Sequence, residues 1–305
     1  MNTRPTRTAR TARPAPARRR PARPVRLGPR SVTALALVSL VGLFAFCWPL
    51  FADAGSAVTS HAGDAPWLFA ALLPLLVAVV VATIADCGMD AKAVAMLGVL
   101  AAVGAALRPL GAGTAGLEPM FFLMVLSGRV LGPGFGFVLG AVTMFASALL
   151  TGGVGPWMPF QMLSMGWFTM GAGLLPGPWL RGRGELLMLS AYGFVAAFAY
   201  GTIMNLQGWV LLQGLSSGIS FQPGAPLHEN LVRFLAYVAA TSLGWDLGRA
   251  VLTVVLTLTV GGTLLKALRR ATRRANFEAQ VTFEGPGTPS PGEPPHRTYV
   301  TYDAE

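Results

Sequence analysis

Residues 126–176 contain a single charged side chain, that of Arg129, in 51 positions. Two apolar runs lie inside this stretch, at 134–150 and 157–175, and a glycine-rich turn joins them. A helix of about 20 residues covers the hydrocarbon core of a bilayer, so each run is about long enough to cross it once. The stretch therefore predicts two consecutive membrane helices.

Glycines recur at every fourth position where the first of these helices begins. Gly132, Gly136 and Gly140 share one helix face, and Pro133 can start that helix. Small residues at this spacing allow two membrane helices to approach backbone to backbone. Because glycine is frequent in membrane helices in general, the spacing fits either a close helix contact or ordinary glycine usage. Both interpretations predict a buried, helical segment.

The composition extends the membrane prediction to the whole chain. Hydrophobic residues make up 53% of the 305 residues and charged residues only 12%, against about 25% charged in soluble domains. We therefore predict an all-α, polytopic membrane bundle of about eight transmembrane helices. The run at 119–131 would be only about 20 Å long as a helix, so it needs a thinner bilayer or shielding by protein. The eight apolar runs are 31–51, 67–85, 93–107, 119–131, 134–150, 157–175, 185–207 and 231–265.

Changes in composition divide the chain into four parts. Residues 1–30 and 271–305 are polar and rich in proline, which predicts disordered tails. Residues 31–89 contain two N-terminal helices, and residues 90–270 contain a six-helix core. The first run could belong to a signal peptide cleaved near residues 52–54, but it is longer than the usual 7–15-residue signal core. A retained helix is the preferred interpretation.

The positive charge is concentrated beside membrane segments. Residues 1–30 and 266–274 hold 15 of the 23 basic residues of the chain. This is the positive-inside pattern, which predicts a multi-pass protein of the cell (plasma) membrane with both termini in the cytoplasm. Anionic lipid headgroups attract such residues. Nucleic-acid binding is not expected, because the N-terminal tail has no aromatic residues to stack on bases.

Several enzyme classes are excluded by missing motifs. A P-loop needs a Gly-Lys pair, and the only lysines, Lys92 and Lys266, follow Ala91 and Leu265. The chain has no aspartate-rich pair for a magnesium–diphosphate site and no His-Glu-x-x-His sequence. Its three histidines are far apart, and its two cysteines are not expected to form a disulfide. We therefore predict no enzyme activity, no metal site and no cofactor.

Charged residues at membrane depth are costly and are the first candidates for a functional site. Asp246 and Arg249 are three residues apart, so they share a helix face and can pair. Such a pair either orders the bundle or contacts a substrate. Arg108 and Glu118 bracket the predicted outer loop 109–117, where they either bind a solute or tether the loop. Arg129 is expected to extend to the inner headgroups.

Polar and aromatic residues near the outer helix ends complete the predicted substrate site. Tryptophans at this depth usually form an interfacial belt, so each one alone is a weak signal. Their convergence with Asp246 in the outer half of the membrane would be a stronger one. The residues are Trp157, Gln161, Asn205, Trp209 and Trp245.

The run at 93–107 has a face of small residues. Gly98, Ala102 and Ala106 are spaced by four, with Ala101 and Ala105 beside them. Such a face either packs inside the bundle or forms a flat docking surface for another membrane protein.

Three glycine motifs resemble those of the substrate-binding (S) component of energy-coupling factor (ECF) transporters, the vitamin-uptake ABC systems. They are Leu-Gly-Pro at 131–133 with glycines at 136 and 140, Thr-Gly-Gly-x-Gly-Pro at 151–156, and Gly-x-Gly-Leu-Leu-Pro at 171–176. The alanine-rich run at 93–107 also resembles the first helix of that family. The resemblance covers residues 90–270. The two preceding helices and the arginine-rich tail depart from the family pattern.

This resemblance implies a six-helix bundle that captures a vitamin-like solute from outside, under the loop after its first helix, here residues 108–118. It also implies a T-component membrane protein and two ABC ATPase subunits as partners, with the T component on the small face at 93–107. The long polar loop 208–230 would suit a corrinoid such as cobalamin. The alternative is a self-sufficient secondary transporter, a class that commonly shows internal repeats and a midplane ion site. This chain shows no convincing repeat, and Asp246 is the only acid that we expect to be buried within a membrane run.

Overall fold

The structure, a computed structural model, describes residues 29–50, 73–74, 76–78, 80–81, 91–111, 115–177, 180–212 and 217–275. The regular structure of these residues is entirely helical, and no strand occurs among them. The predicted all-α class is therefore confirmed for the described part of the chain. The two tails were predicted to be disordered, and almost all of their residues lie outside the described part of the chain.

The helices match most of the predicted runs to within two residues at either end, because each run is bounded by glycine, proline or charge. Most of the run at 67–85 lies outside the described residues. The elements are α1 (Pro29–Cys47), η1 (Trp48–Leu50), α5 (Ala91–Leu107), η2 (Pro109–Gly111), α6 (Met120–Leu131), α7 (Pro133–Thr151), α8 (Met158–Leu174), α9 (Arg183–Trp209), η3 (Val210–Leu212), α10 (Leu227–Thr241), α11 (Leu243–Thr259) and α12 (Gly261–Ala275).

The last run differs from the prediction of one long segment. It is divided between α10 and α11, which meet at Ser242 with a bend of 62°. A third helix, α12, starts at Gly261 and continues to Ala275. Residues 271–275 are therefore helical rather than part of a disordered tail.

Four helical segments in the described part are long and apolar enough to cross a membrane, and the bent pair α10–α11 would be a fifth. They support a polytopic helical membrane protein, whereas the total of eight crossings remains a prediction.

The short helix α6 is not long enough to cross a membrane by itself, but ten of its twelve residues are buried. It is shielded by protein, which removes the need for a thinner bilayer at this point.

Glycine allows α7 and α8 to pack closely, which favours a close helix contact over ordinary glycine usage as the explanation of the four-residue spacing. A Cβ atom added at Gly136 would lie 2.9 Å from the backbone oxygen of Thr169, and one at Gly140 would overlap the backbone oxygen of Met165. Gly132 lies just before α7, with φ of 91°, a conformation that favours glycine.

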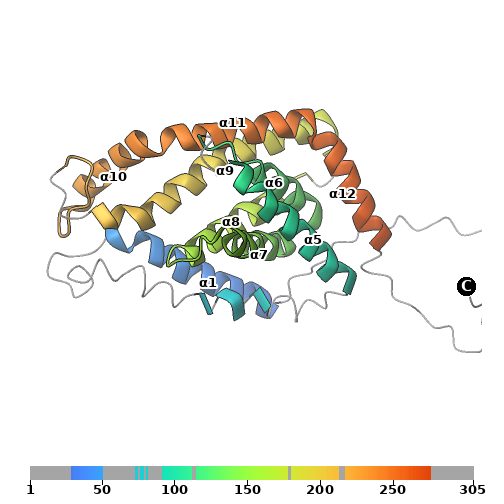
Figure 1. Cartoon of the computed structure of the whole chain (residues 1–305), viewed down its shortest axis with the longest axis horizontal. Coiled ribbons are helices and arrows are strands. Elements are labelled where there is room, and N and C mark those ends of the chain that lie inside the picture. Colours follow the sequence, from blue (N-terminus) through green and yellow to red (C-terminus); the bar gives the residue numbers. More distant parts are fainter. Residues whose placement is uncertain are drawn as a thin grey trace, which may run out of the picture.

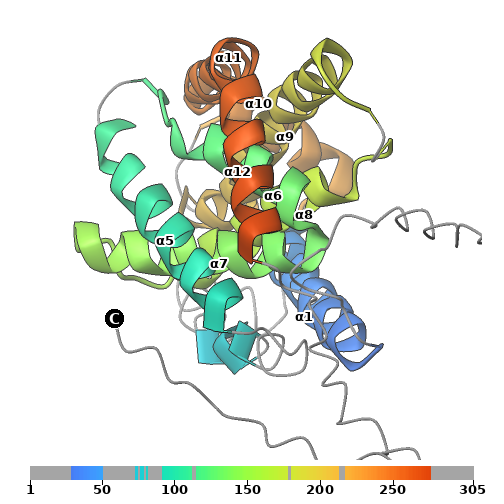
Figure 2. The same ribbon diagram turned by 90° about the vertical axis from the view of Figure 1, so that its right-hand side faces the viewer.

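Helices α9, α10 and α11 lie roughly along the long axis of the molecule, α7 lies across it, and α12 crosses one end of the bundle (Figures 1 and 2). We call this end the α12 end. The Arg129–Glu185 and Arg269–Glu185 ion pairs join the C-terminal end of α6, the start of α9 and α12 at this end. Arg129 also donates to the backbone oxygen of Leu175, just after α8. Arg108, after α5, contacts the last part of α7 and the first turn of α8.

Candidate functional site

A buried ion cluster connects the loop after α5 to α11. Arg249 donates from Nη1 to Asp246 Oδ1 at 2.6 Å and from Nε to Glu118 Oε2 at 3.2 Å. Asp246 is 2% exposed and Arg249 is 8% exposed. The pair between Asp246 and Arg249 was expected from their spacing, whereas the second acid, Glu118, was expected beside Arg108. We call Glu118, Asp246 and Arg249 the ion triad.

Aromatic rings surround the guanidinium group of the ion triad. Arg249 Cζ lies 4.8 Å from the ring centre of Phe121 on α6 and 5.3 Å from that of Tyr200 on α9. The two rings contact each other edge to face at 4.9 Å. Transferring a charge from water into a protein costs several kcal/mol per ion. Two carboxylates and two ring faces together offset this cost for Arg249.

Glycines bring the elements of the triad together. A Cβ atom at Gly201 on α9 would overlap the Asp246 carboxylate, and one at Gly248 on α11 would overlap the backbone oxygen of Ala115. Ala115 and Gly116 have positive φ angles of 51° and 83°, so the loop turns tightly where it meets α11. This turn places Glu118 beside Arg249.

Arg108 holds the other end of the same loop. It donates to Ser147 Oγ on α7 and to Gln161 Oε1 on α8, both at 3.3 Å. The two ends of the loop are therefore tethered to different helices, Arg108 to α7 and α8, and Glu118 to α11. Residues 112–114 between them lie outside the described residues.

Two buried polar atoms of the site have no hydrogen-bond partner among the described residues, Asp246 Oδ2 and Asn205 Nδ2. The other side-chain atom of Asn205, Oδ1, accepts from Ser242 Oγ at 3.0 Å. Asn205 follows Gly201 by one turn of α9, and Ser242 precedes Asp246 by one turn at the start of α11. An unsatisfied buried polar group costs about 1–3 kcal/mol. One free acceptor and one free donor thus occupy the α9–α11 interface.

An open pocket of about 310 Å³ lies between α8 and α9, and its wall residue Val195 is 67% exposed. Tyr200 belongs both to its wall and to the surroundings of Arg249. Phe168, another wall residue, contacts Phe121 at 5.0 Å. The pocket is therefore separated from the ion triad by a single layer of aromatic rings. The lining residues are Ser164, Trp167, Phe168, Tyr192, Val195, Ala196, Ala199, Tyr200 and Ile203.

The predicted tryptophans do not join this cluster. Trp209 is fully buried at the end of α9, where its indole N–H donates to Ile219 O at 2.8 Å and its ring packs against Phe221 and Phe234. Sequence analysis placed it at the start of a loop. Trp157 and Trp245 are 43% and 48% exposed. The structure thus brings together Arg108 with Gln161, Asn205 with Ser242, and Glu118 with Asp246.

The small residues of α5 occupy two different faces. Gly98, Ala102 and Ala106 are exposed, and a Cβ atom at Gly98 would meet no other atom within 4 Å. Ala101 and Ala105 are each 3% exposed. They face the bundle together with Gly104, where an added Cβ would lie 2.6 Å from Thr143 Cγ2 on α7.

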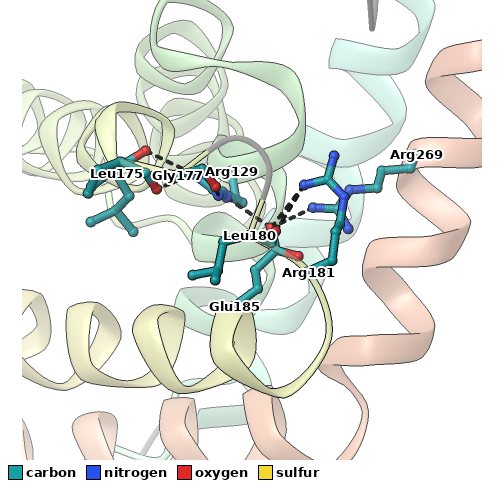
Figure 3. A network of polar contacts seen from close by, with 8 residues as sticks. Arg129, Leu175, Gly177, Leu180, Arg181, Glu185 and Arg269 are labelled. Carbon is teal, nitrogen blue, oxygen red and sulfur yellow. Dashed lines mark hydrogen bonds and ion pairs between the residues drawn. The ribbon is translucent and has the colours of Figure 1, made fainter.

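A second ion cluster lies at the α12 end. The carboxylate of Glu185 is 1% exposed and is contacted by Arg129 at 3.0 Å, Arg269 at 2.5 Å and Arg181 at 3.8 Å (Figure 3). The expectation that Arg129 extends to the headgroups is wrong, since its side chain is only 5% exposed. Glu185, which is 56 residues away in the chain, binds it instead, and sequence analysis gave no signal for this pairing.

A comparison of this chain with models of protein families, with curated proteins and with solved structures finds no match. The function is therefore inferred from the residues and their geometry.

Proposed function

We propose that this chain is the membrane-embedded substrate-binding component of an ECF-type transporter, which captures a vitamin-like solute from outside the cell. The observation that carries this proposal is the position of the ion triad. It lies directly against the loop that follows α5, where the resemblance to S components places the solute.

The chemistry of the site fits a polar organic solute. Asp246 Oδ2 can accept a hydrogen bond from such a solute, and Asn205 Nδ2 can donate one. The neighbouring pocket of about 310 Å³ is at the small end of ligand pockets, which span roughly 300–1,000 Å³. A compact vitamin matches this volume, whereas a corrinoid such as cobalamin would extend beyond the open side of the pocket.

The exposed face of α5 supports the proposed partner. Because Gly98, Ala102 and Ala106 point out of the bundle, they leave a flat strip on which a T-component helix can pack closely. Two ABC ATPases complete the proposed assembly, since neither lysine of this chain lies in a P-loop. The assembly would be in the cell membrane, with both termini of this chain in the cytoplasm.

The test is solute binding by the purified chain together with the energy source for uptake. We expect one compact vitamin in a panel to bind the isolated chain, and uptake to require co-expressed T and ATPase subunits.

The second candidate, a secondary transporter, is favoured by the buried acid Asp246. It predicts that the chain alone, in liposomes, accumulates solute along a proton or sodium gradient. Gradient-driven uptake without ATPases would overturn the proposal.

A further inference from the structure

The ion triad contains more negative charge than positive charge. Glu118 and Asp246 are both acids, and Arg249 is the cation that binds them, at 3.2 Å and 2.6 Å respectively. No further ion pair to either acid occurs among the residues that the structure describes. Arg108, another cation near this loop, donates instead to uncharged side chains of α7 and α8. If both acids are ionised, one negative charge of the triad therefore has no counter-charge.

The surroundings of Asp246 do not compensate this extra charge. Asp246 is only 2% exposed, and α9 brings Gly201 directly against its carboxylate. The charged and titratable groups around it are Arg249, Glu118 and Tyr200. The phenol of Tyr200 is neutral at neutral pH, and the face of its ring attracts a cation rather than an anion. A buried charge without a partner is strongly disfavoured, so such a site favours a neutral overall state.

One atom of the triad is free to receive a positive group. Arg249 binds Oδ1 of Asp246, whereas Oδ2 is buried and has no hydrogen-bond partner among the described residues. The side chain of Glu118 is 25% exposed, against 3% for that of Asp246. Water can therefore stabilise the charge of Glu118 but not that of Asp246, and burial disfavours the charged form of an acid. The extra charge is thus most costly on Asp246.

We propose that the ion triad is a site for one positive group at Asp246 Oδ2. In the free protein a proton occupies this atom, and the triad is then neutral overall. The identity of the second occupant rests on the proposed function: an N–H cation of the captured solute takes the place of the proton, which passes to water. Asn205 Nδ2, the free donor in the same interface, is available for an uncharged acceptor of that solute. The substrate class is therefore a compact organic cation.

The proton can be tested without any solute. A protonated carboxyl group has an infrared C=O band that a carboxylate lacks, and the sample is the purified full-length chain in detergent micelles at neutral pH. We expect this band in the unmodified chain, and we expect it to shift when aspartate carries carbon-13 in its carboxyl group. Glu118→Gln should abolish the band, because one acid then balances one arginine. Glu229→Gln, which removes an exposed acid on α10, is the matched control and should keep it.

Three results would overturn the proton site. They are the absence of the band from the unmodified chain, a band that does not shift on aspartate labelling, and a band that persists in Glu118→Gln. The last result would assign the proton to burial alone rather than to the balance of charge. If Glu118→Gln fails to fold, the labelled unmodified chain still decides.

The solute class is tested with compact vitamins that differ in charge. Pyridoxamine and pyridoxine share one ring system, and pyridoxamine carries one more positive charge at neutral pH. Thiamine is a second cation, and biotin is an anion. In titration calorimetry we expect the vitamin that binds to be a cation, and its binding to remove the infrared band. If pyridoxamine binds, pyridoxine should bind roughly tenfold to hundredfold more weakly, since it lacks the charged donor.

The two arms separate the failure of this inference from the failure of the proposed function. Stronger binding of pyridoxine or biotin than of the cations overturns the solute class and leaves the proposed function in place. Binding of no vitamin, with the infrared band present, overturns the proposed function and the solute class with it. In that case the proton site remains supported.

Discussion

At the scale of single residues, Asp246 can be tested separately for stability and for binding. In Asp246→Asn, Arg249 keeps its bond to Glu118 at 3.2 Å. We therefore expect a smaller loss of stability than the roughly 3–5 kcal/mol typical when a buried ion loses its only partner. If Asp246 Oδ2 binds the solute, its affinity should fall roughly tenfold to hundredfold. Titration calorimetry and a melting curve of the purified variant measure both.

The control for this change is Glu229→Gln, which neutralises an exposed acid on α10. It should alter neither affinity nor melting temperature. An unchanged affinity in Asp246→Asn together with a lowered melting temperature would assign Asp246 to structure alone.

Arg249 is expected to matter more for folding than either of its acids. Replacing it as Arg249→Met leaves Glu118 and Asp246 near each other without a cation. Breaking a buried pair in this way costs roughly 3–5 kcal/mol, to be measured as a change in the free energy of unfolding. Arg270→Met removes an exposed arginine from α12 and should cost little. Equal losses in the two variants would contradict the structural role of the triad.

At the scale of helices, the contact between α7 and α8 depends on Gly140. In Gly140→Ala the new methyl group would overlap the backbone of Met165, so the helices must move apart. We expect a loss of roughly 1–3 kcal/mol, as for other overpacked sites. Gly98→Ala on α5 adds the same group in open space and should be neutral or slightly stabilising. Thermal unfolding in detergent compares them, and a Gly140→Ala protein as stable as Gly98→Ala would show that the helices are not so close.

The two faces of α5 provide a matched test of partner docking. Ala102 is exposed and Ala101 is buried. Ala102→Leu should therefore leave folding and solute binding intact but abolish uptake and co-purification with the T component. Ala101→Leu should instead lower the melting temperature, because its larger side chain enters the bundle. Retained uptake in Ala102→Leu would remove this face from the proposed interface.

Helix positions could be predicted from the sequence, whereas the partners of their polar residues could not. The runs that became α5 to α9 are uninterrupted and end at glycine, proline or charge, so their bounds are local properties. No proline marks the break at Ser242, and the local signals were only Ser242, a residue type favoured at helix N-termini, and Gly244. The bonds of Glu185 to Arg129 and of Glu118 to Arg249 join residues 56 and 131 positions apart. Such pairs depend on the tertiary arrangement.

At the scale of the molecule, the positive-inside rule explains why only part of the site was predictable. Arg129, Arg181 and Arg269 lie at the α12 end, which the rule therefore predicts to face the cytoplasm. The rule predicts on which side of the membrane a basic residue lies, but not which residues its side chain contacts. Arg108 is an exception to the charge pattern, and it makes polar contacts with Ser147 and Gln161 at the start of the loop after α5. In the sequence, Arg108 was the available signal for this loop, because it is a basic residue on the predicted outer side, where the rule leads us to expect few basic residues.

The orientation of the whole bundle gives the last prediction. The basic residues of α12 predict that the α12 end faces the cytoplasm and that η2 faces outside. Leu110 in η2 is 68% exposed, and Arg270 on α12 is also exposed. In a background with Cys47 and Cys87 replaced by serine, a membrane-impermeant maleimide should label Leu110→Cys in intact cells. It should label Arg270→Cys only after the membrane is permeabilised. The reverse pattern would place the ion triad nearer the cytoplasm, where it could not capture a solute from outside.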